Sequence, residues 1–213
     1  AEPGSENIGV GRDDGKETGE HAAIFYRTDK FDEIEKGDFW LSETPDVPSK
    51  GWDAVLPRIC SWGHFKCKDT GFEFLFFNLH MDHIGKKARV ESAFLVQDKM
   101  KELGKGKELP AILTGDFNVD QTHQSYDAFV SKGVLCDSYE KAGFRYAING
   151  TFNDFDPNSF TESRIDHIFV SPSFQVKRYG VLTDAYRRNV GKGENKQAND
   201  CPEEIDIKTY QAR

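Results

Sequence analysis

Residues Ala111–Asn118, with the sequence AILTGDFN, run from an apolar strand directly into a turn that carries a carboxylate and a carboxamide. The uninterrupted apolar run predicts a strand buried on both faces, and Gly115 permits another backbone to approach where that strand ends. Residues two apart on extended backbone point the same way, so Asp116 and Asn118 could together hold a hard cation or activate a water. An Asx-type turn, in which both side chains only cap backbone amides, explains this segment alone equally well.

Two further segments place polar groups at the ends of apolar strands. Phe77–His83 (FNLHMDH) ends one strand with a cluster of polar and ionisable side chains, and Arg164–Ser171 (RIDHIFVS) begins another strand with a carboxylate. Three strand ends with such groups favour a functional site over three independent capping turns.

The order N-x-H-x-D-H, G-D-F-N and R-I-D-H-I-F-V-S resembles the endonuclease/exonuclease/phosphatase family, which shares its fold with deoxyribonuclease I. The resemblance runs from about Ile8 to Asp184. It implies an α/β fold in which two sheets form a sandwich flanked by helices, with the site at one edge of the sheets. The family's N-terminal Asn and Glu motifs and its C-terminal S-D-H motif have no match here, so we expect a domain that is incomplete at both ends.

The same resemblance implies roles for four residues. Asp116 would orient or deprotonate the attacking water and, together with Asn118, would hold Mg²⁺ or Mn²⁺ as the cofactor. His80 would bind or protonate a phosphate oxygen, although a surface or core histidine is the plainer interpretation. Asp166 would orient the histidine of the S-D-H motif, and an ion pair with Arg164 is its alternative.

Three more residues are candidates for substrate binding. Arg12 lies in a Gly-rich acidic turn, where a guanidinium could bind a phosphate in a bidentate way or could pair with a neighbouring aspartate. Tyr26 could reach a phosphate, but a tyrosine on a strand more often packs. Asn153, in the turn before the third motif, could contact substrate. Arg58 and the tryptophans near it could shape access to the site.

Local periodicity predicts the elements around these motifs. Two strands, at residues 60–67 and 72–80, are expected to pair as a hairpin because a turn ending in glycine joins them. Apolar residues recur at three- and four-residue intervals from Gly85 to Leu103, which predicts a helix that ends at Gly104 and covers a sheet.

The composition predicts one soluble domain over residues 1–213, with a flexible insertion at residues 186–204 that is rich in Gly, Asn, Lys and Arg. A net charge of −8 argues against affinity for long duplex nucleic acid, which rests on Lys and Arg, and favours a smaller phosphate-ester partner. No run is apolar enough for a membrane span. The oligomeric state and compartment stay open, and removal of a signal peptide would make the protein secreted or periplasmic.

The sequence supports two functions. The first is a metal-dependent phosphoesterase that hydrolyses a phosphodiester or a phosphomonoester, with nucleic acid, lipid, sugar phosphate and inositol phosphate all open as substrates. The alternative is a catalytically silent fragment or a binding module of the same fold, because the Glu and S-D-H motifs have no match. On that ground we expect weak or no turnover from these 213 residues alone.

Overall fold

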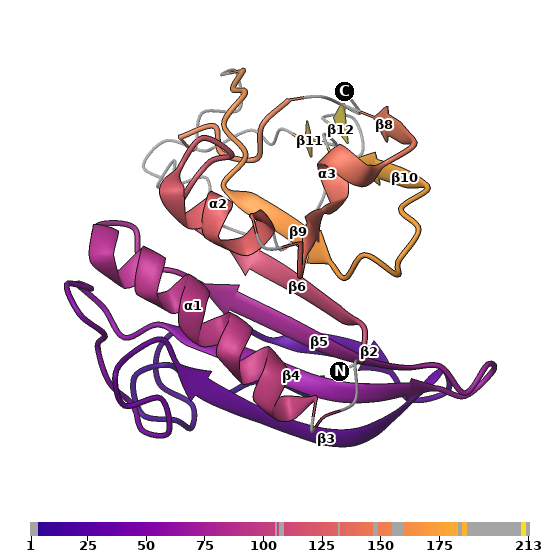
Figure 1. Cartoon of the computed structure of the whole chain (residues 1–213), viewed down its shortest axis with the longest axis horizontal. Helices are drawn as coiled ribbons and strands as arrows, with labels where there is room; N and C mark the ends of the chain where they lie inside the picture. The colour runs from indigo at the N-terminus through magenta and orange to yellow at the C-terminus, as the bar shows by residue number, and fades with distance from the viewer. Residues whose placement is uncertain are drawn as a thin grey trace.

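A computed structural model describes residues 4–104, 106, 109–131, 133–146, 149–154, 160–182, 185–186 and 210–211. A six-stranded sheet with the order β3-β4-β5-β6-β9-β7 forms its centre (Figure 1). The strands of this sheet are β3 (Phe31–Trp40), β4 (Ile59–Cys67), β5 (Glu73–His80), β6 (Ala111–Asp116), β9 (Asp166–Val170) and β7 (Cys136–Asp137). The helices are α1 (Lys86–Leu103), α2 (Gln124–Val130) and α3 (Ser138–Lys141).

Three two-stranded sheets complete the described strands. They are the antiparallel pair β1 (Ser5–Ile8) and β2 (Ile24–Arg27), the parallel pair β8 (Phe144–Tyr146) and β10 (Arg178–Gly180), and the antiparallel pair β11 (Ala185–Tyr186) and β12 (Tyr210–Gln211). The expected insertion at residues 186–204 lies outside the described residues except for its first position.

The predicted hairpin and helix are both present. β4 and β5 pair antiparallel, and α1 connects β5 to the parallel strand β6. Gly85 supplies no side-chain cap for α1, so Asp53 from a distant loop does so: its carboxylate accepts from the backbone N–H of Ala88 at 2.7 Å. A carboxylate at this end also complements the helix dipole.

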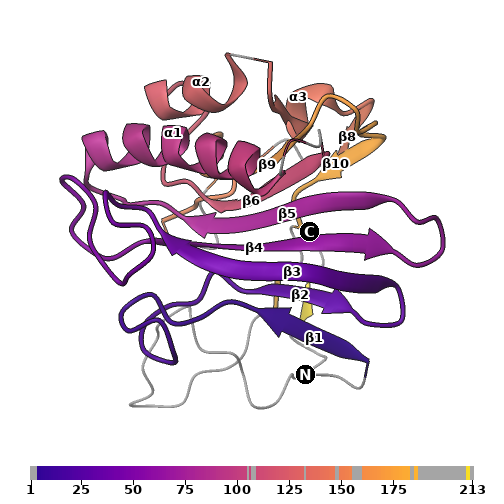
Figure 2. The ribbon, with the colours of Figure 1, turned by 60° about the horizontal axis from the view of Figure 1, so that its bottom comes forward.

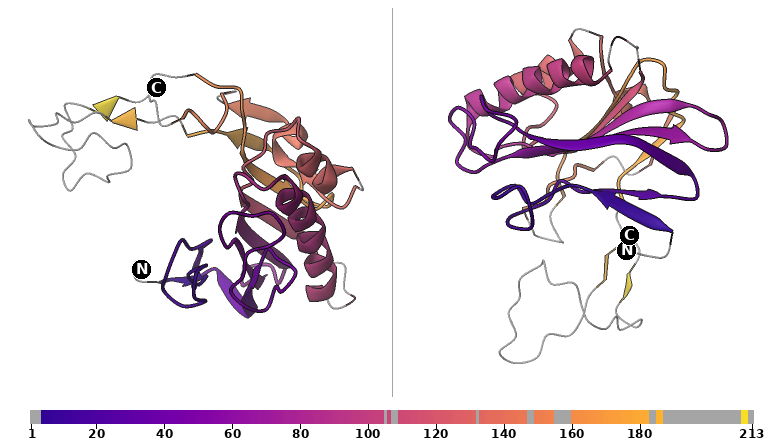
Figure 3. Two further views of the ribbon diagram at one scale, coloured as in Figure 1. Left: turned by 90° about the vertical axis from the view of Figure 1, so that its left-hand side faces the viewer. Right: turned by 90° about the horizontal axis from the view of Figure 1, so that it is seen from below.

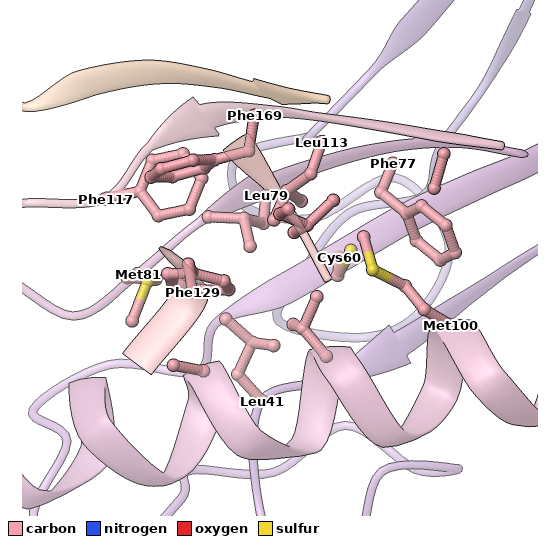
Figure 4. Packing of buried hydrophobic residues seen from close by; sticks show 14 of the residues in the cluster. Leu41, Cys60, Phe77, Leu79, Met81, Met100, Leu113, Phe117, Phe129 and Phe169 are labelled. Atoms are coloured by element: carbon pink, nitrogen blue, oxygen red, sulfur yellow. The ribbon is translucent and has the colours of Figure 1, made fainter. Parts of the chain in front are cut away.

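One face of the sheet packs against the helices to form the main core. The side chains at alternate positions of β5, Leu75, Phe77 and Leu79, are almost completely buried against α1 residues such as Val96 and Met100. Figure 4 shows this cluster extending to the aromatic rings of Phe117, which follows β6, of Phe129 in α2 and of Phe169 in β9. The alternation explains why β5 is apolar on both faces from Phe74 to Phe77, since the residues between those of the main core face the opposite side.

The opposite face is covered by the β1–β2 pair, where Ile8 and Ile24 pack with Phe65 of β4 and with Phe74 and Phe76 of β5. Figure 3 shows α1 on one side of the central sheet and β1–β2 on the other. The predicted α/β class with helices outside a layered sheet is confirmed. Within the described residues, the β1–β2 pair and its connection cover part of this face, and Phe174 from the connection after β9 packs against Phe72.

The ten-residue strand β3 has a sequence, FDEIEKGDFW, that is rich in charge. A register shift between Glu33 and Glu35 interrupts its pairing with β4, so polar and apolar residues do not alternate regularly along it. In the described part of the chain, no helix combines the length and apolar character that crossing a membrane requires.

Candidate active site

Three neighbouring strands bring three candidate residues into one row. His80 at the end of β5 is the register partner of Asp116 at the end of β6, and Asp116 is the partner of Asp166 at the start of β9. By the alternation of each strand, all three lie on the face that carries β1–β2. The long connections after β1 and β3 lie at the same end of the sheet, at the left in Figure 2. The structure thus brings together residues that are 86 positions apart in the sequence.

Gly115 makes the close approach of β5 and β6 possible at this row. Its φ of +142° is a conformation that side chains rarely adopt, and a Cβ there would lie 1.9 Å from the carbonyl oxygen of Leu79. The sequence-based expectation of a close backbone contact at Gly115 is therefore correct, and the neighbouring strand is what approaches.

The chain turns immediately after Asp116, which corrects one geometric expectation. β6 ends at Asp116, and Asn118 has a left-handed φ of 50°, so the two side chains do not project from continuous extended backbone. The backbone N–H of Asn118 donates to Asp116 Oδ1 at 2.8 Å, and the Asn118 side-chain amide donates to the carbonyl of Met81 at 2.9 Å. The Asx turn is present, and it leaves Asp116 Oδ2 and Asn118 Oδ1 as further oxygens for a ligand.

His80 lies between two carboxylates. Its Nε2 is 3.6 Å from Asp116 Oδ2, and its Nδ1 is 3.2 Å from Glu20 Oε2. Burial lowers the pKa of His80 to about 4, and the nearby positive charges of Arg58 and Arg12 add to this more than Glu20 offsets. The imidazole is therefore neutral near pH 7, and these contacts are polar contacts instead of ion pairs.

The carboxyl group of Asp116 has the opposite shift. Burial raises its pKa to about 6, and the neighbouring charge of Asp166 adds to this while the hydrogen bond from Asn118 opposes it. A carboxylate with a pKa near neutrality is both ionised at pH 7 and basic enough to accept a proton from water.

Glu20 is a site residue that the sequence motifs did not reveal. The connection between β1 and β2 folds back on itself, with an isolated bridge between Gly11 and His21, so Arg12 faces Glu20. Arg12 Nη1 contacts Glu20 Oε2, and Arg12 Nε is 3.7 Å from Asp13 Oδ1. The sequence could have indicated Glu20 in one way: it is a charged residue immediately before a predicted strand, and a hairpin there would place it opposite Arg12.

Arg164 and Asp166 do not pair with each other. Arg164 is buried, lies 3.0 Å from Asp137 Oδ2 and stacks over the ring of Tyr139 at 3.8 Å, whereas Asp166 is exposed. Thr151 Oγ1 accepts hydrogen bonds from the backbone N–H groups of Ile165 and Asp166, each at 3.0 Å. The alternative ion pair between Asp166 and Arg164 is thus absent, because Arg164 pairs with the buried Asp137. The hydroxyl of Thr151 holds the start of β9.

Two predicted substrate-binding residues have different outcomes. The Tyr26 hydroxyl lies 2.8 Å from Glu6 Oε2, and its ring packs on Phe65 with centroids 5.0 Å apart. Phe65 is opposite Phe74, which precedes His80 by six residues on β5, or by roughly 20 Å of strand. Tyr26 is therefore not at the site, because it packs in the second core. Asn153 is exposed two residues after Thr151, and its contact with substrate stays a prediction.

Hard oxygen donors and surplus negative charge make the site suitable for a divalent cation. Asp116 and Glu20 flank His80, and Asp166 lies beyond Asp116 in the row. Burial raises the pKa of Asp116, and the carboxylates of Asp166 and Glu20 add to this while Arg58 opposes them. In the part of the chain that the structure describes, no three His, Cys, Asp or Glu side chains converge to form a metal site. Asp116 and Asn118 would therefore supply only two protein side chains to a Mg²⁺ or Mn²⁺ ion, which would need water and substrate oxygens as its further ligands.

Comparisons with known proteins identify the family and agree with the fold. A sequence model of the Endonuclease/Exonuclease/phosphatase family matches residues 23–185. A structure of an endonuclease/exonuclease/phosphatase family protein from Bacteroides thetaiotaomicron is 90% identical, with a TM-score of 0.85 over 87% of this chain and 66% of that chain. A mannosyl-6-phosphatase from Bacteroides thetaiotaomicron VPI-5482 is 87% identical, with a TM-score of 0.85 over 88% of this chain and 70% of that one.

A more distant relative is uncharacterised protein L388 of Acanthamoeba polyphaga mimivirus. It is 31% identical over 175 residues, which are 79% of this chain and 56% of that protein. The chain thus spans little more than half of the curated relative and about two thirds of the similar solved structures.

Proposed function

Because the chain belongs to the endonuclease/exonuclease/phosphatase family, we propose that it hydrolyses a phosphomonoester of a hexose with the help of Mg²⁺ or Mn²⁺. The family is phosphoesterase-like, and the metal and the substrate are the proposed part. The observation that carries the proposal is the row of His80, Asp116 and Asp166 across three strands, with Glu20 and Arg12 at its edge.

Hydrolysis of a phosphate ester needs an activated water, donors for the phosphoryl oxygens and assistance to the leaving oxygen. Asp116 is suited to accept a proton from water because its pKa is about 6. His80 is neutral and has a single N–H, so donation to a phosphoryl oxygen would replace its contact with Asp116 or Glu20. Asp166, exposed at the same end of the sheet, can orient a proton donor for the leaving group.

A divalent cation bound by Asp116 and Asn118 would supply neutralisation of phosphoryl charge. The chain's own residues then position the substrate: the carboxamide of Asn118 is fixed by Met81, and Arg12 can exchange part of its contact with Glu20 for a phosphate oxygen. The left-handed backbone of Asn118 is strained, and such strain is often found at functional sites.

The substrate proposal is supported by the mannosyl-6-phosphatase that is 87% identical to this chain. It is also consistent with the net charge of −8, which disfavours long polyanions but does not prevent binding of a small dianion where Arg12 and a bound divalent cation would neutralise its charge. Among the substrates that the sequence left open, these observations favour a sugar phosphate.

The experiment is a hydrolysis panel with mannose 6-phosphate, glucose 6-phosphate, an aryl phosphodiester and a short oligonucleotide, each with Mg²⁺, Mn²⁺ or EDTA. It uses both the 213-residue chain and the full chain that its gene encodes. We expect metal-dependent release of phosphate from the hexose monoesters and loss of that activity in Asp116→Asn. Preference for the diester would overturn the substrate proposal, and binding of hexose phosphate without turnover in either form would favour the binding-module alternative.

A further inference from the structure

A buried charged cluster lies directly behind the end of β5. Arg58, Asp82 and Arg89 are 3%, 2% and 6% exposed. Arg58 Nε donates to Asp82 Oδ1 at 3.2 Å, and Arg89 Nη1 donates to the backbone carbonyl of Asp82 at 2.9 Å. Asp82 Oδ2 also accepts from the backbone N–H of Gly85 at 2.7 Å, at the start of α1. Arg58 therefore pairs with the carboxylate of Asp82 and Arg89 with its backbone carbonyl, and two guanidinium groups beside one carboxylate give the cluster surplus positive charge.

Arg58 also determines the chemical form of His83. Its Nη2 lies 2.8 Å from His83 Nδ1. A guanidinium has only donor N–H groups, so Nδ1 must be the acceptor and must lack a hydrogen. The hydrogen of the neutral imidazole is then on Nε2, and His83 is exposed at the surface. This structure thus presents a pre-set N–H donor on a side chain whose other nitrogen is held by a buried arginine.

His83 also lies near the row of candidate catalytic residues. It follows His80 by three residues, and the two imidazoles are close enough to interact electrostatically. Arg58 interacts electrostatically with Arg12 and Glu20, the two residues at the other edge of the site. Glu20, which belongs to the β1–β2 connection, lies with its Oε2 atom 3.2 Å from His80 Nδ1. The buried cluster and the β1–β2 connection therefore both lie next to His80.

We propose that His83 is a substrate-binding residue whose Nε2–H donates to a phosphoryl oxygen of the bound ester. Arg58 and Asp82 are the positioning residues that hold its tautomer. The surplus positive charge of the cluster favours an anionic oxygen over a sugar hydroxyl as the acceptor. This inference rests on the proposed function, but binding of phosphate tests it even without turnover.

Two substitutions separate this role from a purely structural one. His83→Asn keeps an acceptor near the position of Nδ1 for Arg58 but removes the distal donor. His83→Gln is longer and restores an N–H donor near the position of Nε2. The binding measurement is calorimetric titration of inorganic phosphate in the presence of Mg²⁺, with mannose as a second ligand. The kinetic measurement is kcat and KM for mannose 6-phosphate, and thermal melting reports on the fold.

We expect His83→Asn to weaken phosphate binding and raise KM about tenfold, the effect of losing one hydrogen bond to a charged oxygen, with kcat and melting temperature nearly unchanged. His83→Gln should recover most of the loss. In the parent, ¹⁵N-detected imidazole spectra should show His83 as the Nε2–H tautomer, with a shift on phosphate addition.

Equal phosphate binding in the parent and in His83→Asn would overturn the inference. So would a loss shared by both variants together with a lower melting temperature, since that result shows a structural role, and so would an effect on mannose binding alone. A parent that binds phosphate but hydrolyses no ester would refute the proposed function and leave the role of His83 to be decided by the binding data.

Discussion

Asp116→Asn tests the energetic cost of placing an ionised carboxylate in the row between β5 and β9. The substitution preserves shape, and the carboxamide oxygen can still accept from the backbone N–H of Asn118, as Asp116 Oδ1 does at 2.8 Å. It removes only the charge and the ability to accept a proton from water. We therefore expect a loss of turnover of at least about a hundredfold together with an increase in the stability of the metal-free protein.

The size of the stability change follows from the pKa of Asp116, which rises from its ordinary value of 3.8 to about 6. At roughly 1.4 kcal/mol per pKa unit, the ionised group costs at most about 3 kcal/mol at pH 8. The side chain is 32% exposed, and solvent screening reduces this figure to about 1–2 kcal/mol.

The sign depends on pH. The folded protein binds the proton of Asp116 more tightly than the unfolded chain does, so protonation stabilises the fold fully below pH 3.8, and this contribution is lost as the pH rises through 6. Asparagine has no proton to lose. The gain in free energy of unfolding from Asp116→Asn should be largest at pH 8 and should fall to about a third of that value at pH 4.5.

The assay is urea unfolding in EDTA at pH 8 and pH 4.5, with steady-state hydrolysis measured separately in Mg²⁺. Asp69→Asn is the matched control, because Asp69 lies in an exposed turn where its side chain is 65% exposed and pairs only with Lys30 among the contacts described. It should change stability by less than about 0.5 kcal/mol at both pH values. An Asp116→Asn protein that is less stable than the parent at pH 8 would refute the desolvation argument, and retained turnover would refute the assignment of Asp116 to the chemical step.

The remaining predictions concern the site and the interior. His80→Ala should lower kcat by about a hundredfold while KM changes less than about threefold, and an unchanged kcat with a raised KM in steady-state kinetics would limit His80 to ground-state binding. Gly115→Ala should cost about 3–5 kcal/mol in urea unfolding, because a Cβ would lie 1.9 Å from the Leu79 carbonyl oxygen at a φ of +142°. Asp137→Ala should cost about 3–5 kcal/mol by leaving the buried guanidinium of Arg164 without its main partner, and a melting temperature equal to that of the parent would contradict that role.

The local sequence was sufficient to predict those helices and strands in which buried residues recur with the period of the helix or strand itself. The helix predicted from Gly85 to Leu103 is α1, Lys86–Leu103, because its buried residues recur on one side of a 3.6-residue turn. The apolar run at Ala111 is the strand β6, but it is buried only on the face toward the helices and half-buried on the other, where burial on both faces was expected. His80, Asp116 and Asp166 could be expected at strand ends because each follows or begins an apolar run, and their resemblance to ordered family motifs made one shared site the best hypothesis.

Register between distant strands decided the rest. Periodicity tells which face a residue occupies but not which residue lies opposite, so nothing local indicated that Arg164 pairs with Asp137 instead of Asp166. Tyr26 was misplaced for the same reason, since only the pairing of β2 with β1 and its packing on Phe65 show how far along the sheet it lies. Glu20 reaches His80 because the β1–β2 connection folds over the end of the sheet. Arg58 meets His83 because two chain segments 25 residues apart pack at the start of α1, and such contacts arise only when the whole domain is assembled.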